Sequence, residues 1–70
     1  MNHSMKAARK AARVLNGLTQ EDLAEAIGKQ QAWVSLVENG RMLPTKSEAA
    51  EIAKVLQVET HELFKRYCDQ

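Results

Sequence analysis

The sequence is poor in several residue types, and each shortage excludes a class of protein. Its 70 residues include only one cysteine, one proline, three glycines and one each of Trp, Tyr and Phe. A single cysteine, Cys68, excludes an intramolecular disulfide framework and favours a reducing compartment. Few glycines, prolines and aromatic residues argue against many short strands joined by tight turns.

The features of membrane proteins, metalloproteins and enzymes are also missing. No apolar run approaches the roughly 18 residues of a membrane span, and the start lacks a hydrophobic signal segment. His3, His61 and Cys68 are the only soft metal ligands, and no further ligand is spaced to close a zinc site. There is no glycine-rich phosphate loop and no nucleophile with a suitable base. We therefore expect a cytoplasmic protein that is not an enzyme and has no cofactor, metal or membrane partner.

The charge has no dominant sign, but it is unevenly divided along the chain. Ten Lys and Arg against nine Asp and Glu give a formal net charge of +1, which argues against a generic polyanion binder. Residues 1–46 hold seven Lys and Arg and four Asp and Glu, whereas residues 47–70 hold three and five. Near-neutrality therefore does not exclude a nucleic-acid partner, and it predicts modest non-specific affinity.

Strong helix formers dominate the composition, and their spacing predicts an all-α fold of five short helices. The first helix runs from Met5 to Leu15 and ends at Asn16-Gly17. Its apolar stripe consists of Met5, Ala8, Ala12 and Leu15, widened by Ala11 and Val14. A second, basic face of the same helix carries Lys6, Arg9, Lys10 and Arg13.

The remaining helices are predicted from their caps and apolar positions. Thr19 caps the second, which buries Leu23 and Ile27 and stops at Gly28. The third runs from about Gln30 to Glu38 and is closed by Asn39-Gly40, and the loop 41–44 follows. The apolar and capping positions of the last two helices are Thr45, Glu48, Ala49, Ile52, Ala53 and Leu56 in the fourth and Thr60, Leu63, Phe64 and Tyr67 in the fifth.

Residues 1–4 are interpreted as a tail, in which Ser4 could cap the first helix, and residues 5–70 as a single domain.

The stretch 20–39 contains two short helices joined at Gly28, with Val34 and Val37 spaced to anchor the second helix on the first. An ordinary corner between two helices is one interpretation. At about 100° per residue, the side opposite the valines carries short, uncharged side chains, where a solvated face normally shows Lys or Glu. We infer that this side of the helix is covered rather than left to solvent. It consists of Gln31, Ala32, Ser35 and Leu36.

The run LTQEDLAEAIGKQQAWVSLVENGRMLP resembles the helix-turn-helix of the Cro/CI-type (XRE) family of phage and bacterial repressors. The matching features are the TQEDLA start, the Ala24 and Gly28 pair, the valine anchors and the VENGR ending. The match covers about residues 6–64. It implies a compact, lambda-repressor-like five-helix bundle whose second motif helix enters the DNA major groove.

Carried over position by position, the resemblance implies base contacts by Gln31, Ala32, Ser35 and Leu36. Gln31 is suited to a bidentate pair with adenine, and Ala32 and Leu36 to thymine methyl groups. A solvated helix-start residue is the alternative for Gln31. Leu36 departs from the family, which often has a long polar or basic residue there, so a protein contact by this face stays open.

The resemblance also implies contacts to the DNA backbone by Gln20, Lys29, Gln30, Trp33, Asn39 and Arg41. The alternatives are a purely capping role for Thr19 beside Gln20, solvated charges for the two cations, and core packing for Trp33. Arg13 and Glu38 match a family pair that forms a partly buried salt bridge between the first and third helices. Two independent surface charges are the alternative.

These observations predict a sequence-specific transcription regulator, with repression favoured, that binds double-stranded DNA as a homodimer on a pseudo-palindromic site. The resemblance implies a bacterial or phage-encoded, nucleoid-associated protein. The candidate dimer surface is the C-terminal helix and tail, although Leu63 and Phe64 also suit the core: Val58, Leu63, Phe64, Tyr67 and Cys68. The alternative is a protein-interaction module, such as an antitoxin-like or adaptor subunit.

Overall fold

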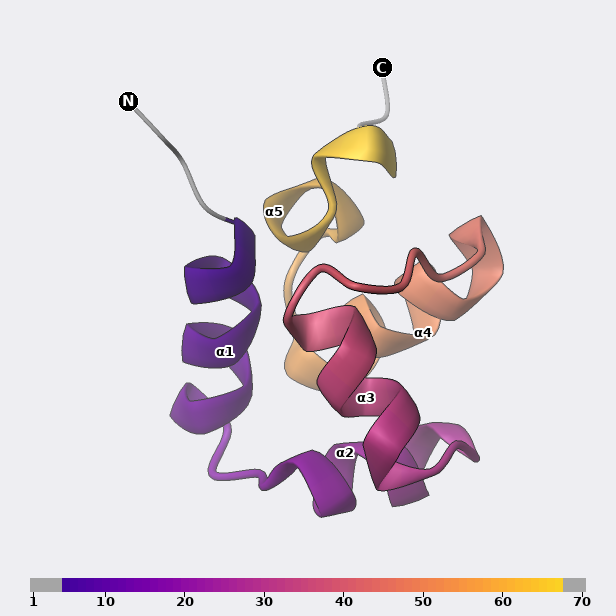
Figure 1. Cartoon of the computed structure of the whole chain (residues 1–70). Coiled ribbons are helices and arrows are strands. Elements are labelled where there is room, and N and C mark those ends of the chain that lie inside the picture. Colours follow the sequence, from indigo (N-terminus) through magenta and orange to yellow (C-terminus); the bar gives the residue numbers. More distant parts are fainter. Residues whose placement is uncertain (1–4, 68–70) are drawn as a thin grey trace.

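Figure 1 shows the computed structural model of the chain, which describes residues 5–67. Every regular element in that range is helical, so the predicted all-α fold of five helices is confirmed. The elements are α1 (Met5–Leu15), α2 (Gln20–Ile27), α3 (Gln31–Glu38), α4 (Lys46–Leu56), α5 (Thr60–Leu63) and the 3-10 helix η1 (Lys65–Tyr67). His3, Ser4 and Cys68, for which sequence-based roles were considered, lie outside the described residues.

Two helices begin directly after the threonines that the sequence predicts as caps. The Asp22 backbone N–H donates to the Thr19 hydroxyl at 3.0 Å, and the Asp22 carboxylate accepts from the Thr19 N–H at 3.0 Å. Thr45 and Glu48 make the same reciprocal pair at 3.1 and 2.8 Å. Each box satisfies two backbone donors that the first turn of a helix leaves without partners. The predicted starts of α2 and α4 are therefore confirmed.

The start of α3 and the whole of α5 differ from the prediction. Gln30 is the cap residue of α3 rather than its first residue, and its side chain makes no capping hydrogen bond. Glu59, not Thr60, caps α5, and the Glu62 carboxylate accepts from the Glu59 N–H at 3.1 Å. The helix then ends after four residues.

The early end of α5 has a tertiary cause. The Leu63 carbonyl accepts a hydrogen bond from Arg9 Nη1 at 2.9 Å, in place of the amide that would continue the helix. Phe64 adopts an extended backbone with φ −134° and ψ 96°, and its ring lies in the core. The Tyr67 N–H then donates to the Phe64 carbonyl at 2.9 Å to form η1. A predicted helix that includes Phe64 and Tyr67 is therefore wrong.

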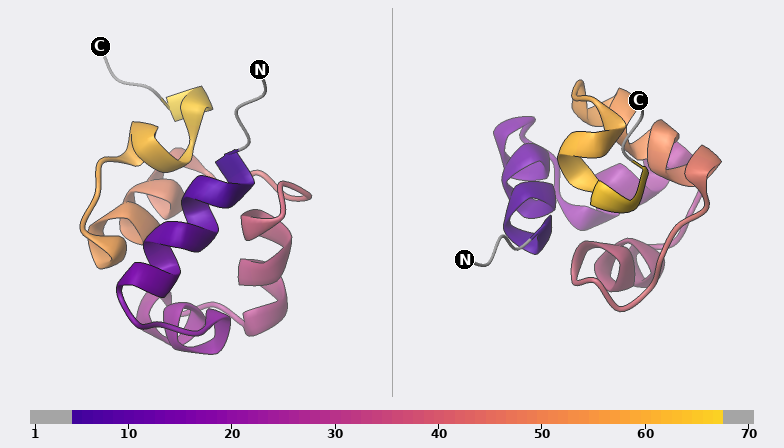
Figure 2. Two further views of the ribbon diagram at one scale, coloured as in Figure 1. Left: turned by 90° about the vertical axis from the view of Figure 1, so that its left-hand side faces the viewer. Right: turned by 90° about the horizontal axis from the view of Figure 1, so that it is seen from above.

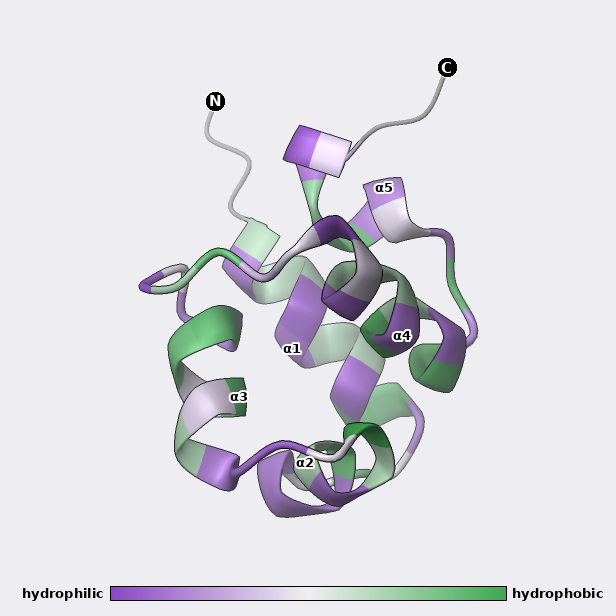
Figure 3. Ribbon diagram, turned by 90° about the vertical axis from the view of Figure 1, so that its right-hand side faces the viewer, coloured by the Kyte–Doolittle hydropathy of each residue, from purple (hydrophilic) through white to green (hydrophobic). Residues whose placement is uncertain are grey.

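The core is drawn from α2, α3, α4 and the α5 region. Figure 3 shows hydrophobic segments alternating with hydrophilic ones along these helices, as expected when one face of each helix is buried. The buried apolar residues are Leu23, Ala24, Val34, Val37, Ala49, Ile52, Ala53, Leu56, Leu63 and Phe64. The predicted apolar face of α4 is confirmed. Leu63 and Phe64, considered for a dimer surface, are only 1% and 4% exposed and belong to the core.

The orientation of α1 corrects the sequence prediction. Val14 is 55% exposed and Leu15 is 85% exposed, so the apolar stripe of this helix does not face the core as a whole. Two of its basic side chains, Arg9 and Arg13, turn inward instead. They do so because α3 and α5 present a carboxylate and backbone carbonyls to this side of α1.

The helices form one bundle with extents of 30 × 24 × 22 Å. Figures 1 and 2 show the start of α1 and η1 at the same end of the bundle, with α2 at the opposite end. No helix within residues 5–67 has the length and apolarity needed to cross a membrane.

Candidate nucleic-acid interface

A tight turn joins α2 to α3. Gly28 adopts a left-handed backbone with φ 71°, which costs glycine little. The Lys29 N–H donates to the Ala24 carbonyl at 2.9 Å and closes the turn. Ala24, Val34 and Val37 are 2%, 2% and 3% exposed, so the side chains expected to anchor α3 do so. The turn and these anchors fix the direction in which α3 presents its outer face.

That outer face contains the residues predicted to contact bases. Gln31, Ala32 and Leu36 are exposed, and Ser35 is half-buried. Figure 1 shows α3 in front of α4, with one long side directed away from the bundle. No charged side chain belongs to this set of four, which we call the recognition face.

A hydrogen-bonded chain links the recognition face to the interior. Arg13 pairs with Glu38 through Nε to Oε2 at 2.6 Å and Nη2 to Oε1 at 3.2 Å. Gln20 Nε2 donates to Glu38 Oε1 at 2.7 Å, and Gln31 Nε2 donates to Gln20 Oε1 at 2.6 Å. The chain therefore runs from α1 through α3 and α2 back to the first turn of α3.

The carboxylate of Glu38 sets the direction of every bond in this chain. An ionised carboxylate only accepts hydrogen bonds, so Gln20 must turn its amide nitrogen toward Glu38 and its oxygen toward Gln31. Gln31 must then turn its own nitrogen toward Gln20. One N–H and the oxygen of Gln31 are left for an outside partner, which is the donor and acceptor pair that adenine matches.

Glu38 is buried, with 8% of its surface exposed, yet it remains ionised. Burial acts to raise its pKa. Hydrogen bonds from Arg13 and Gln20, together with the positive charges of Arg13 and Lys10, outweigh burial and bring the pKa below its ordinary value. Arg13 also donates Nη1 to the Leu18 carbonyl at 2.8 Å, so its guanidinium is held on three sides.

The residues predicted to contact the DNA backbone have different surroundings. Lys29 Nζ lies 2.7 Å from Glu48 Oε2 and 4.9 Å from the centre of the Trp33 ring. Trp33 itself is half-buried and packs partly on the core. The hydrogen bond from Lys29, followed by that from the Thr45 backbone, lowers the pKa of Glu48. Lys29 and Trp33 therefore fasten the start of α3 to α4.

The other backbone candidates lie nearer solvent. Gln30 and Arg41 are exposed at the two ends of α3. Asn39 Nδ2 donates to the Ser35 carbonyl at 2.8 Å and closes the last turn. Gln20 is half-buried within the hydrogen-bonded chain. The structure thus places cations and amides around α3, but three of them, Gln20, Lys29 and Asn39, already have partners within the protein.

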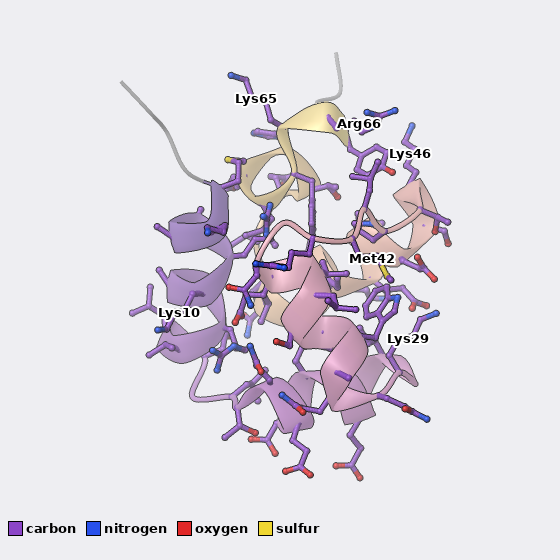
Figure 4. The ribbon with its side chains drawn as sticks, viewed as in Figure 1. Lys10, Lys29, Met42, Lys46, Lys65 and Arg66 are labelled. Atoms are coloured by element: carbon purple, nitrogen blue, oxygen red, sulfur yellow. The ribbon has the colours of Figure 1, made fainter. Side chains whose placement is uncertain are left out.

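Two further cations lie beside α3 that the sequence did not single out as site residues. Lys6 and Lys10 line a groove between α1 and the end of α3, together with Glu38 and Asn39. Figure 4 shows Lys10 on the α1 side of α3 and Lys29 on the other side. The basic face of α1 was the available signal, but its position relative to α3 is a tertiary property.

The turn, the valine anchors and the uncharged outer face define a helix-turn-helix domain. Residues 10–63 match the helix-turn-helix family. The chain is 37% identical over 60 residues to an uncharacterized HTH-type transcriptional regulator of Methanocaldococcus jannaschii. The matched region covers 86% of this chain and 91% of that protein. No solved structure matches the chain significantly. The chain belongs to the XRE-type helix-turn-helix family of DNA-binding transcription regulators.

Proposed function

We propose that this regulator is a sequence-specific repressor that reads the major groove with α3. The observation that carries the proposal is the held position of Gln31. Its amide is oriented through Gln20 by the buried carboxylate of Glu38, at 2.6 and 2.7 Å. A side chain oriented before binding loses less conformational freedom in making a base contact. In this proposal the protein blocks transcription by occupying its site.

Base selection is assigned to the recognition face. Gln31 pairs with adenine through its free N–H and oxygen, a contact that contributes about 1–3 kcal/mol of discrimination against other bases. Ala32 and Leu36 contact thymine methyl groups, and the Ser35 hydroxyl serves as a further donor or acceptor. A face built in this way favours A·T pairs.

Backbone contacts are assigned to the side chains around α3. Arg41, Gln30 and Asn39 contact phosphates directly, and Gln20 does so together with the backbone amides of the first turn of α2. Lys29 contacts a phosphate while it keeps its ion pair with Glu48, and Trp33 packs against a sugar. Lys6 and Lys10 add positive charge on the α1 side. Such contacts position the protein and carry no sequence information.

A second copy of the chain is part of the proposal. One short recognition helix makes few base contacts, so useful specificity requires two half-sites. Within residues 5–67, Val58 and Tyr67 of the predicted dimer surface remain partly exposed. We propose that these two residues contribute to the contact between the two copies. Since its partner is chromosomal or phage DNA, we place the protein in the cytoplasm.

The test measures the anisotropy of a labelled mixed-sequence duplex over a range of salt concentrations. Binding that depends on phosphate contacts weakens steeply as salt rises, with a slope of about −0.9 per phosphate neutralised. The variant Arg41→Ala should weaken binding to all sequences alike and reduce the slope by about one. Lys54→Ala is the matched control, because it removes an exposed cation from the last turn of α4.

Absence of duplex binding at low salt would contradict the proposal. Salt-independent binding, or equal effects of the two variants, would contradict the assignment of Arg41. The exposed apolar surface of Ala32 and Leu36 would then favour the second candidate function, a protein-interaction module such as an antitoxin-like or adaptor subunit.

A further inference from the structure

A cleft of about 290 Å³ is lined by the start of α1, the loop after α3, and η1. Figure 1 shows these segments toward the end of the bundle opposite α2. Figure 4 shows Lys65 and Arg66 at this end, above the loop that carries Met42. The side chains used in the argument are Met5, Arg9, Met42, Phe64, Lys65 and Arg66. Three of these residues are cationic, and none of the described residues that line the cleft is acidic.

Arg9 forms a fixed positive charge in the wall of this cleft. Its Nε donates to the Glu38 carbonyl at 3.3 Å, its Nη1 donates to the Leu63 carbonyl at 2.9 Å, and the guanidinium lies 5.2 Å from the centre of the Phe64 ring. Both bonds go to neutral carbonyls, and the nearby Glu38 carboxylate is already bound to Arg13. The charge of Arg9 is therefore held in place without a carboxylate of its own.

The third nitrogen of Arg9 is directed at a position without a side chain. Nη2 lies 3.5 Å from the place that a Cβ on Gly40 would occupy. Gly40 has a left-handed backbone with φ 76°, which suits glycine. The loop therefore passes close to the guanidinium of Arg9, a residue that also lines the cleft.

The part of the wall that η1 provides is held by contacts of Tyr67. The Tyr67 hydroxyl donates to the Pro44 carbonyl and ties η1 to the loop after α3. The rings of Phe64 and Tyr67 pack edge to face with centres 6.5 Å apart. Lys65 and Arg66 lie between these two residues, so their backbone positions are set before any partner arrives.

The mouth of the cleft is apolar. Met42 is 39% exposed and Leu43 is 54% exposed, and both adjoin the cleft. Adjacent exposed apolar side chains rimmed by charge are typical of contact surfaces. Methionine in particular adapts to partners of varied shape.

We propose that this cleft docks an acidic, apolar peptide segment of a partner protein. One large apolar side chain enters between Met42 and Phe64. Flanking carboxylates of the segment meet Lys65, Arg66 and the charge of Arg9. Charge complementarity carries the choice of occupant, because a cleft with three cations and no acid among the described residues that line it attracts an anion.

A duplex and a second copy of the chain fit this cleft less well. The outside of a duplex offers phosphates but no apolar group to fill the space between Met42 and Phe64. Within residues 5–67 the most exposed large apolar side chains outside the cleft are Val14 and Leu15, on a helix that has no acidic residue. Helix α1 therefore offers no segment that is both acidic and apolar for the cleft of a second copy to bind.

This docking is separate from the proposed reading of DNA. Gln31 begins α3, whereas the cleft lies beyond its last residue, next to Gly40. The proposed adenine contact and the cleft therefore lie at opposite ends of α3, although Asn39 and Arg41, which are assigned to phosphates, adjoin the cleft. The failure of either assignment leaves the other to be tested on its own.

The test is an amide chemical-shift titration of the full ¹⁵N-labelled chain with the capped peptide GDLEFDLEG. We expect saturable shifts at Gly40, Met42 and Lys65, and a Kd that rises about tenfold in the double variant Lys65→Glu, Arg66→Glu. Lys54→Glu, a single charge reversal at an exposed position of α4, should leave the Kd unchanged. A second variant, Met42→Ser at an exposed position, should also weaken binding.

Two control peptides separate charge from apolar contact. Replacing the peptide's acids by Asn and Gln, or its Leu and Phe by Ser, should each weaken binding about tenfold. Unchanged affinity for either control peptide, or for the double variant in its folded form, would overturn the proposal. Shifts of the same amides with a mixed-sequence duplex but not with the peptide would overturn it too, and would assign the cleft to nucleic acid.

Discussion

Glu38 joins the stability of the fold to the proposed reading of DNA. Its carboxylate accepts from Arg13 at 2.6 and 3.2 Å and from Gln20 at 2.7 Å. Through Gln20 it also orients Gln31 at the surface. The ion pair could be expected from the sequence because Arg13 and Glu38 occupy matching family positions. The role of Gln20 as a link could not, since an amide side chain gives no signal of which neighbour it will meet.

Removing the charge of Glu38 should destabilise the protein. In Glu38→Gln the Arg13 guanidinium stays in place without its carboxylate, and breaking a buried pair in this way costs about 3 kcal/mol or more. Urea denaturation followed by circular dichroism measures the change in the free energy of unfolding. Glu51→Gln, at an exposed position on α4, should stay within about 0.5 kcal/mol of the wild type. Equal stability of the two variants would show that the pair contributes nothing.

At the scale of elements, the helices are predictable where local side chains decide their ends. Thr19 and Thr45 could be identified as caps because both partners of each capping box lie within four residues. The end of α5 could not be identified in this way. It depends on Arg9, which lies 54 residues away and takes the Leu63 carbonyl. The inward turn of the α1 arginines is hidden for the same reason, because periodicity shows two faces but not which one meets the core.

The caps give a prediction at this scale. Thr45→Ala removes the hydroxyl that accepts from the Glu48 N–H and should lower the free energy of unfolding by about 1 kcal/mol. Thr60→Ala is the informative comparison, because the sequence suggests a cap there and the structure assigns it to Glu59. We expect a change within about 0.5 kcal/mol for Thr60→Ala, measured by thermal or urea unfolding. A larger loss at Thr60 than at Thr45 would contradict the observed helix starts.

At the scale of the whole molecule, three carboxylates among residues 5–67 link stability to pH. The pKa of Asp22 is lowered by hydrogen bonds from the Thr19 backbone and hydroxyl, that of Glu48 by Lys29 and the Thr45 backbone, and that of Glu38 by Arg13 and Gln20 against the effect of burial. A carboxyl whose pKa is lower in the folded state stabilises the fold above its ordinary pKa. That contribution is lost as the pH falls through the lowered value.

Stability should therefore be flat from neutral pH to about pH 5 and should fall below it. The fall should continue below the ordinary pKa values of 3.8 for Asp22 and 4.5 for the glutamates. Urea unfolding at a series of pH values measures the effect. In Glu38→Gln the fall should be shallower, because one of the three groups no longer titrates. Constant stability down to pH 3 would contradict the account.

The recognition face is predictable from the sequence, whereas its surroundings are not. The helical wheel around Val34 and Val37 identifies the outer face of α3, because two anchors fix the rotation of a short helix. The positions of Lys6 and Lys10 beside it, and the cleft next to Gly40, depend on how α1 and η1 pack. The spacing of residues along one helix does not indicate how that helix packs against the others.

The most direct test of the central claim is selection of bound sites from a random duplex library. The wild type and Gln31→Ala are compared, with Ser47→Ala at an exposed position of α4 as the control. We expect the wild type and Ser47→Ala to enrich the same two-fold symmetric site. Gln31→Ala should lose the preference for adenine at one position of each half-site and keep the others. No enriched site for the wild type, or an identical site for Gln31→Ala, would contradict the claim that α3 reads DNA through Gln31.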